Sequence, residues 1–116
     1  MTRGEIWWVD FGIPFGSENG YKRPALIIQN DEFNSSRIRT VVVIPFSTNL
    51  DLSEAPGNVF LEKRATGLTK DSVLVTSLIA SIDQTRLVGR ISTVDKRTFG
   101  EIEDGIRILL GMGRFA

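Results

Sequence analysis

The chain has 116 residues, of which 41% are hydrophobic and 24% charged, a composition typical of a folded domain and not of a disordered or fibrous protein. Its 14 Lys and Arg residues balance 14 Asp and Glu residues, so any contact with nucleic acid must come from local charge placement. The absence of cysteine and histidine excludes disulfides, thiolate or His-ligated metal sites and imidazole general bases.

Length and pattern also predict how the chain is organised. A length of 116 residues suits one domain, and we expect residues 1–116 to form it without an internal boundary. No apolar run approaches the roughly 18 residues of a membrane span, and the N-terminus lacks the pattern of a signal peptide. We therefore expect a cytoplasmic protein with no membrane partner.

Six short runs rich in β-branched and aromatic residues predict strands, because turn residues bound each of them. The third run is the most continuously apolar and should be central in the sheet, although Pro45 near its end predicts a bulge or bend. Gly89 in the last run predicts another bulge or a close backbone approach. The runs span residues 5–11, 24–31, 40–47, 59–62, 72–79 and 87–91. Six strands joined by loops predict a small barrel, closed or partly open.

Two polar connections separate the first three runs. Residues 12–20 hold three glycines and a proline and form either a long hairpin connection or a mobile flap over a substrate groove. Residues 32–39 include two arginines. This segment is either an ordinary solvated loop or the extension of a basic rim that begins at Lys22 and Arg23.

The period of the apolar residues changes near the C-terminus. Spacings of three and four predict an amphipathic helix from about residue 94 to residue 110. Ser92 or Thr93 could cap its start, and Gly111 could end it. Two internal glycines weaken such a helix by roughly 1 kcal/mol each, so packing against the sheet must hold it. The fold class is therefore mainly β with a C-terminal α-helix.

The residues available for chemistry are a cation at the start of the second run and two hydroxyls after the third. If these strands are antiparallel neighbours, Arg23 and Ser47 or Thr48 lie at the same end of the sheet, within side-chain reach. A guanidinium fork suits phosphate oxygens, and a hydroxyl can donate to the same group. Together they could stabilise a phosphorane during attack by the ribose 2′-OH of RNA, which requires no metal or other cofactor. The alternative is an ordinary rim charge beside an ordinary turn.

Five segments, in register along most of the chain, resemble the MazF/PemK family. These proteins are the toxins of bacterial toxin–antitoxin pairs and act as sequence-specific, ribosome-independent endoribonucleases, or mRNA interferases. Each motif alone is weak, whereas five in order are specific. They are RGEIW (3–7), GSE (16–18), RPALIIQND (23–31), TVVVIP with STN (40–45 and 47–49), and ID with RL (82–83 and 86–87).

The resemblance implies an SH3-like barrel of the MazF/CcdB type with a C-terminal helix. It also implies a homodimer with a groove for single-stranded RNA or mRNA at the dimer interface, and a cognate antitoxin protein whose C-terminal segment occupies that groove. Cleavage in the family leaves a 2′,3′-cyclic phosphate, or in some cases a 3′-phosphate, and a 5′-OH. We expect contact with DNA only through the toxin–antitoxin complex.

The resemblance also suggests site residues. The family's catalytic arginine falls on Arg23 and its catalytic hydroxyl on Ser47 or the adjacent Thr48. Because a guanidinium is a poor general base, we assign Arg23 to phosphate stabilisation and to proton donation to the leaving oxygen, and leave the base unassigned. The residues expected to contact RNA are Ser17, Glu18, Lys22, Gln29, Asn49 and Arg86.

Several interpretations remain open at this stage. A buried structural ion pair of Arg86 with Asp83 or another carboxylate competes with its RNA contact. Trp7 and Trp8 could stack bases or lie in the core or dimer interface. The family's acid–glutamine pair is missing from residues 77–83, which bears on cleavage specificity. Two other functions compete with the nuclease: a gyrase-binding toxin of the same fold, acting through residues 113–116, and a catalytically silent RNA- or peptide-binding module.

Overall fold

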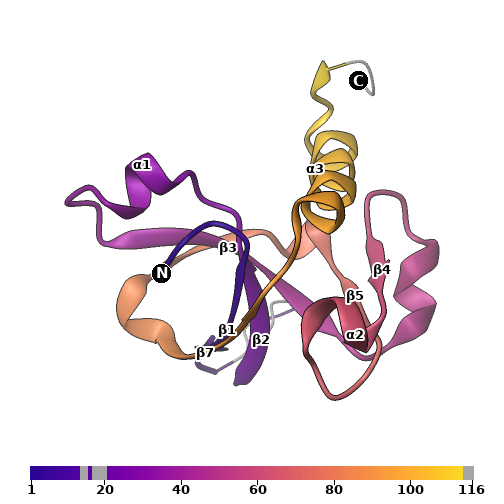
Figure 1. Cartoon of the computed structure of the whole chain (residues 1–116), viewed down its shortest axis with the longest axis horizontal. Coiled ribbons are helices and arrows are strands. Elements are labelled where there is room, and N and C mark those ends of the chain that lie inside the picture. Colours follow the sequence, from indigo (N-terminus) through magenta and orange to yellow (C-terminus); the bar gives the residue numbers. More distant parts are fainter. Residues whose placement is uncertain (14–15, 17–20, 114–116) are drawn as a thin grey trace.

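The computed structural model describes residues 1–13, 16 and 21–113, and Figure 1 shows a β-rich molecule with a long helix near the C-terminus. The described strands are β1 (Glu5–Asp10), β2 (Lys22–Ile27), β3 (Thr40–Ser47), β4 (Val59–Leu61), β5 (Ser72–Leu74), β6 (Ala80–Asp83) and β7 (Leu87–Thr93). The described α-helices are α1 (Asp31–Asn34), α2 (Lys63–Thr66) and α3 (Lys96–Leu110), and short 3-10 helices are η1 (Leu50–Glu54), η2 (Thr76–Leu78) and η3 (Gln84–Arg86). None of the helices in these ranges is long and apolar enough to cross a membrane.

The predicted fold class, mainly β with a C-terminal α-helix, is confirmed. The strands follow the order β4-β5-β3-β2-β1-β7, with β6 paired to β3, and every pairing is antiparallel. No hydrogen-bonded pairing of the described strands joins β4 to β7, so the sheet is open and not a closed barrel. The strand count is seven because Ala80–Asp83, which follow the predicted run 72–79, form β6, whereas within that run only Ser72–Leu74 are a strand and Thr76–Leu78 form the turn η2.

Strand β3 is central, as its apolar sequence predicts, and it changes partner along its length. Its residues 40–43 pair with β6, whereas Phe46 and Ser47 pair with β5. Pro45 lies between these two segments, where the missing N–H costs no ladder bond, and its carbonyl accepts from Val75 N at 3.1 Å. On the other edge, Pro45 faces Ala25 of β2 without a register shift, so of the predicted bulge or bend the structure shows no bulge against β2 but a change of partner from β6 to β5 at Pro45.

Register shifts occur instead in the pairing of β1 with β7. One lies between Ile6 and Trp7 and the other between Trp8 and Val9, next to the Trp8–Gly89 pair. The irregularity expected at Gly89 therefore lies next to it, at Val88, whereas Gly89 itself pairs with Trp8. A bulge leaves one residue unpaired and strengthens the local twist of the strand.

The core consists of two clusters on opposite faces of the β1–β2–β3 sheet. Alternation along β1 sends Ile6 to the first cluster and Val9 to the second. Helix α3 packs on the first cluster through Ile102, which has no exposed surface. The first cluster contains Ile6, Leu26, Ile44, Phe46, Leu61, Leu74, Val94 and Ile102, and the second contains Val9, Ala25, Ile27, Val41 and Val43.

Helix α3 stands above β4 and β5 in Figure 1, and its ends differ in how well they were predicted. Gly111 ends the helix in the left-handed conformation, with φ 64°, as predicted. The N-cap is Asp95 and not Ser92 or Thr93, because these two residues still belong to β7. The Asp95 carboxylate accepts from Thr98 N at 2.8 Å.

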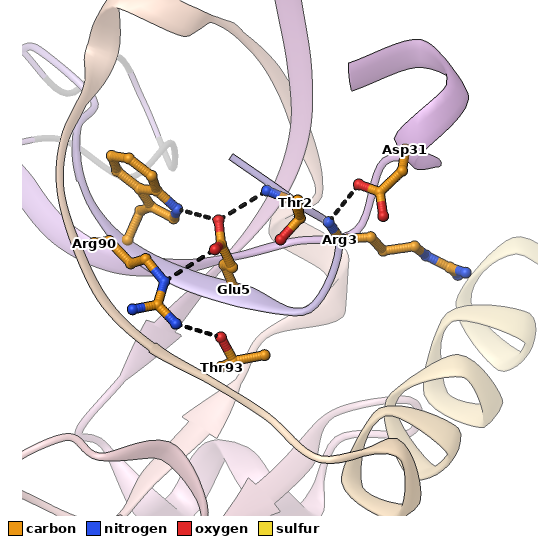
Figure 2. Close-up of polar contacts among 7 residues, drawn as sticks. Thr2, Arg3, Glu5, Asp31, Arg90 and Thr93 are labelled. Carbon is orange, nitrogen blue, oxygen red and sulfur yellow. Dashed lines mark hydrogen bonds and ion pairs between the residues drawn. The ribbon is translucent and has the colours of Figure 1, made fainter. Parts of the chain in front are cut away.

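A carboxylate at the start of β1 ties three segments together (Figure 2). Glu5 Oε1 accepts from Thr2 N at 2.8 Å and from Trp7 Nε1 at 3.0 Å. Glu5 Oε2 accepts from Arg90 Nε at 2.9 Å, and Arg90 Nη2 donates to Thr93 Oγ1 at 2.7 Å. The indole of Trp7 is thus held against the second cluster. Burial alone would raise the pKa of Glu5, but the hydrogen bonds from Trp7, Thr2 and Arg90 outweigh it and lower that pKa.

We expect the substitution Glu5→Gln to lower the free energy of unfolding by about 1–2 kcal/mol at neutral pH, because hydrogen bonds to a charged group are lost. Since the folded pKa is lowered, the stabilisation is full above the ordinary carboxyl pKa and is lost as pH falls through the lowered value. The difference from the wild type, measured by thermal unfolding, should therefore shrink in acid. Glu101→Gln, at an exposed carboxylate of α3, is the control. A pH-independent difference would contradict this assignment.

Candidate functional site

A pocket of about 240 Å³ opens where β2 begins and β3 ends. The pairing of Ala25 with Pro45 places Arg23, two residues before Ala25, and Ser47, two residues after Pro45, at the same end of the sheet. This agrees with the sequence-based expectation that the two strands are antiparallel neighbours. The described lining residues include two cations and no carboxylate. They are Tyr21, Lys22, Arg23, Pro24, Phe46, Ser47, Thr48 and Ser72, and we call this the Arg23 pocket.

Arg23 is half-buried, and its Nε atom is buried without a hydrogen-bond partner among the described residues. Buried donors are nearly always paired in native proteins, so an unpaired one requires an explanation. An anion that entered the Arg23 pocket would supply the missing acceptor. A guanidinium remains charged at any physiological pH and presents several donors to phosphate oxygens.

The two predicted hydroxyl residues lie where the chain turns away from β3. Ser47 Oγ accepts from Asn49 N at 3.1 Å, which leaves its own proton free to donate to a bound group. Asn49 Oδ1 in turn accepts from Asp51 N at 3.2 Å and caps η1. Thr48 is exposed beside Ser47. The arrangement therefore offers one fixed hydroxyl and one exposed hydroxyl next to Arg23.

The structure does not bring Gln29 to the Arg23 pocket. Gln29 follows the far end of β2, is 8% exposed, and lines a different pocket of about 350 Å³. Its Nε2 donates to Asn34 Oδ1 at 2.9 Å and to Thr40 O at 3.2 Å, and its Oε1 accepts from Val42 N at 3.2 Å. These bonds hold the connection between β2 and β3 and use the amide internally.

Arg86 also lies elsewhere, in a third pocket of about 620 Å³ that residues 77–83 line. Its Nη1 donates to Asp10 O at 3.1 Å. The alternative of a buried ion pair with Asp83 does not hold, because both side chains are exposed and Asp83 Oδ1 accepts from Thr85 N at 2.9 Å. Of the other expected RNA contacts, Lys22 lines the Arg23 pocket, and Asn49 comes directly after Thr48, another lining residue. Ser17 and Glu18 lie outside the described residues.

Four lining residues of the Arg23 pocket are not among the site residues predicted from sequence: Tyr21, Pro24, Phe46 and Ser72. Ser72 comes from β5 and reaches the pocket because the end of β3 changes partner, with Ser47 opposite Val73. Only knowledge of strand order could have identified it. Within the described ranges, no three His, Cys, Asp or Glu side chains gather closely enough to hold a metal ion. Metal-independence stays a prediction, to be tested with a chelator.

The arrangement of strands and helix is that of known MazF toxins. The crystal structure of MazF from Deinococcus radiodurans matches with a TM-score of 0.79 over 97% of each chain, at 22% sequence identity. An endoribonuclease from a mycobacterial species, solved in complex with its cognate antitoxin, matches with a TM-score of 0.79 over 97% of each chain, at 20% identity. At these identities the likeness establishes the fold.

Sequence similarity extends the likeness beyond the fold. The chain is 38% identical over 112 residues to endoribonuclease MazF6 of Mycobacterium tuberculosis strain H37Rv, covering 97% of this chain and 98% of that protein. Residues 2–110 match the family described as PemK-like, MazF-like toxin of type II toxin–antitoxin system. The chain therefore belongs to the PemK/MazF toxin family, and the resemblance inferred from its motifs is confirmed.

Proposed function

We propose that this protein is a sequence-specific, metal-independent endoribonuclease that cleaves single-stranded RNA, mRNA in particular, as the toxin of a toxin–antitoxin pair. The observation that carries the proposal is the Arg23 pocket, in which a cation lies with two hydroxyl residues, Ser47 and Thr48, and has a buried donor with no acceptor in the part of the chain that the structure describes. The relative named endoribonuclease MazF6, 38% identical over nearly the whole chain, supports the same activity.

The pocket suits transphosphorylation, in which the ribose 2′-OH attacks the adjacent phosphorus and the bond to the 5′-oxygen breaks. Arg23 would neutralise the charge that grows on the non-bridging oxygens, and Ser47 or Thr48 would donate a hydrogen bond to the same oxygens. The proton of the 2′-OH passes to a base that we leave unassigned, and the leaving 5′-oxygen takes up a proton, for which Arg23 is our candidate donor. The products are a 2′,3′-cyclic phosphate and a 5′-OH.

The proposal extends to assembly and location. We propose a homodimer with an RNA groove between the subunits, a cognate antitoxin that occupies this groove, and action on mRNA in the cytoplasm by a single domain of residues 1–116. The 620 Å³ pocket supports a partner surface, because Phe11, Ile13, Leu78, Ile79 and Ile82 contribute apolar groups and Ile13 is 89% exposed. The mycobacterial structure with its antitoxin is consistent with such a partner. Roles for Ser17, Glu18, Lys22, Gln29, Asn49 and Arg86 in RNA contact stay predictions.

The gyrase-inhibitor alternative is not favoured, because the curated relatives are named endoribonucleases. Residues 114–116, which that alternative invokes, lie outside the described residues. A silent binding module is distinguished from the nuclease by activity alone.

We expect the purified wild type to cut a long RNA in EDTA and to leave 2′,3′-cyclic phosphate and 5′-OH ends. Ser47→Ala should slow cleavage by about 10²-fold, because the hydroxyl donates to charge that develops only in the transition state. Thr48→Val tests the neighbouring hydroxyl, and Ser53→Ala, at an exposed serine of η1, is the control. End-group analysis and cleavage rates provide the readout. Intact RNA with the wild type would overturn the proposal, and a concurrent block of gyrase supercoiling would favour the inhibitor.

A further inference from the structure

A second pocket of about 270 Å³ adjoins the Arg23 pocket. Three residues, Pro24, Thr48 and Ser72, line both, so the two pockets are direct neighbours. Trp8 of β1 lines the second pocket and is 45% exposed. In the β1–β2 pairing, Trp8 lies opposite Pro24, the residue next to Arg23. We call this the Trp8 pocket.

The far wall of the Trp8 pocket is a short segment that is anchored at both ends. Helix α2 ends at Gly67, whose φ of 73° suits glycine, and the chain then turns past Lys70 toward β5. Lys63 N donates to Asp71 Oδ1 at 2.8 Å, and Ser72 Oγ donates to Lys70 O at 3.1 Å. These bonds form the wall without a ligand and leave Lys70 exposed beside the pocket.

We propose that the Trp8 pocket is a nucleobase subsite of the same RNA site. A base next to the scissile phosphate would stack on the Trp8 indole, and Lys70 would neutralise a flanking phosphate. The inference rests on the proposed function, since it places the scissile phosphate at Arg23. Aromatic stacking combined with a cation is how proteins hold single-stranded nucleic acid. A volume of about 270 Å³ leaves room for a nucleobase.

The position of the Trp8 pocket beside the Arg23 pocket, together with the charge of Lys70, indicates which ligand it would hold. A strand whose phosphate lies at Arg23 carries a base on the adjoining nucleoside, and the Trp8 pocket shares three lining residues with the Arg23 pocket. The pocket offers the hydroxyls of Thr48, Thr69 and Ser72, which can hydrogen-bond a base edge, and a lysine for the backbone. It is therefore expected to determine which base is accepted beside the cut.

Binding of an uncleavable oligonucleotide tests the subsite, with 2′-deoxyribose at the scissile position to remove the nucleophile. We expect Trp8→Ala to weaken binding about 10-fold or more, and Trp8→Phe to recover most of the loss, because phenylalanine also stacks. Lys70→Gln should reduce the salt dependence of binding by about one phosphate contact. Phe60→Ala is the matched control, because Phe60 is 44% exposed and lines neither pocket.

Abasic nucleosides locate the base that occupies the pocket. In the wild type, one abasic position next to the scissile site should weaken binding about as much as Trp8→Ala does. When the same abasic strand is bound by Trp8→Ala, the affinity should fall little further than with either change alone, because both changes remove the same contact.

The subsite is overturned if Trp8→Ala binds every strand as the wild type does. It is also overturned if the loss is additive with every abasic position, or if it accompanies a change in oligomeric state measured on the same sample. Because the strand is uncleavable, these results do not depend on catalysis. A wild type that cuts no RNA in EDTA but shows the Trp8 coupling would retain the subsite and refute the proposed nuclease.

Discussion

Replacing Arg23 with alanine is expected to slow RNA cleavage by about 10³-fold while the protein stays folded. Because the Nε of Arg23 has no hydrogen-bond partner among the described residues, its removal breaks no hydrogen bond of that atom. The substitution also eliminates a buried donor whose lack of an acceptor there costs free energy. What is lost is the positive charge beside the phosphorane. Cleavage rates in EDTA and thermal unfolding of the same sample measure the two effects separately.

Two further variants show what Arg23 contributes. Arg23→Lys keeps the charge but loses the planar fork, so it should recover only a small part of the rate. Arg97→Ala removes an equal charge from an exposed position of α3 and should cut RNA as the wild type does. If Arg23→Ala stayed within a few-fold of the wild-type rate, the proposed mechanism would be wrong.

The largest effect on stability is expected at Gly105 of α3. A methyl group at this position would overlap the carbonyl oxygen of Gly57 and lie 3.1 Å from Val59 Cγ2. The helix backbone therefore packs directly against the chain that leads into β4. Gly105→Ala should lower the free energy of unfolding by about 1–3 kcal/mol, despite the better helix propensity of alanine, because the helix must move outward.

The same helix offers a matched control. At Gly100, a methyl group would meet no atom within 4 Å, so Gly100→Ala should raise the free energy of unfolding by about 1 kcal/mol through helix propensity alone. Urea unfolding of both variants beside the wild type provides the comparison. Changes of the same sign at the two glycines would show that the contact with Gly57 does not hold α3 in place.

Local patterns predicted the elements that have strong sequence boundaries. The run 40–47 matches β3, because a valine-rich stretch lies between polar segments. The break between β5 and β6 was missed, because the turn at Thr76 is held by hydrogen bonds to a residue that is distant in the sequence. Asn58 Oδ1 accepts from Thr76 N at 3.0 Å and from Thr76 Oγ1 at 3.3 Å. Such a long-range contact leaves no local signal in an apolar run.

The N-cap of α3 was also decided by long-range contacts and not by a local sequence signal. Ser92 and Thr93 have the right chemistry for capping, but their hydroxyls are occupied by Thr66 and Arg90. Asp95 takes the role instead. Tertiary contacts, which a single sequence does not display, decided between equally suitable residues.

The residues of the candidate site also differ in whether sequence alone could place them. Arg23 and Ser47 could be placed together from sequence, because they flank adjacent antiparallel strands. Gln29 and Arg86 were expected to contact RNA from resemblance alone, and in this chain they line separate pockets. The Trp8 pocket could not be predicted, because it depends on β5 approaching β2 through the partner change of β3.

The two register shifts of β1 against β7 have a consequence for behaviour at high concentration. An open sheet ends in borders whose backbone groups can recruit strands from other molecules and start aggregates. The described strands leave three borders: β4, which has three residues, β6, which has four and pairs only with β3, and β7, which the shifts twist and which carries Arg90. None of these borders presents a long flat template, so they are poor starting points for strand addition by other molecules.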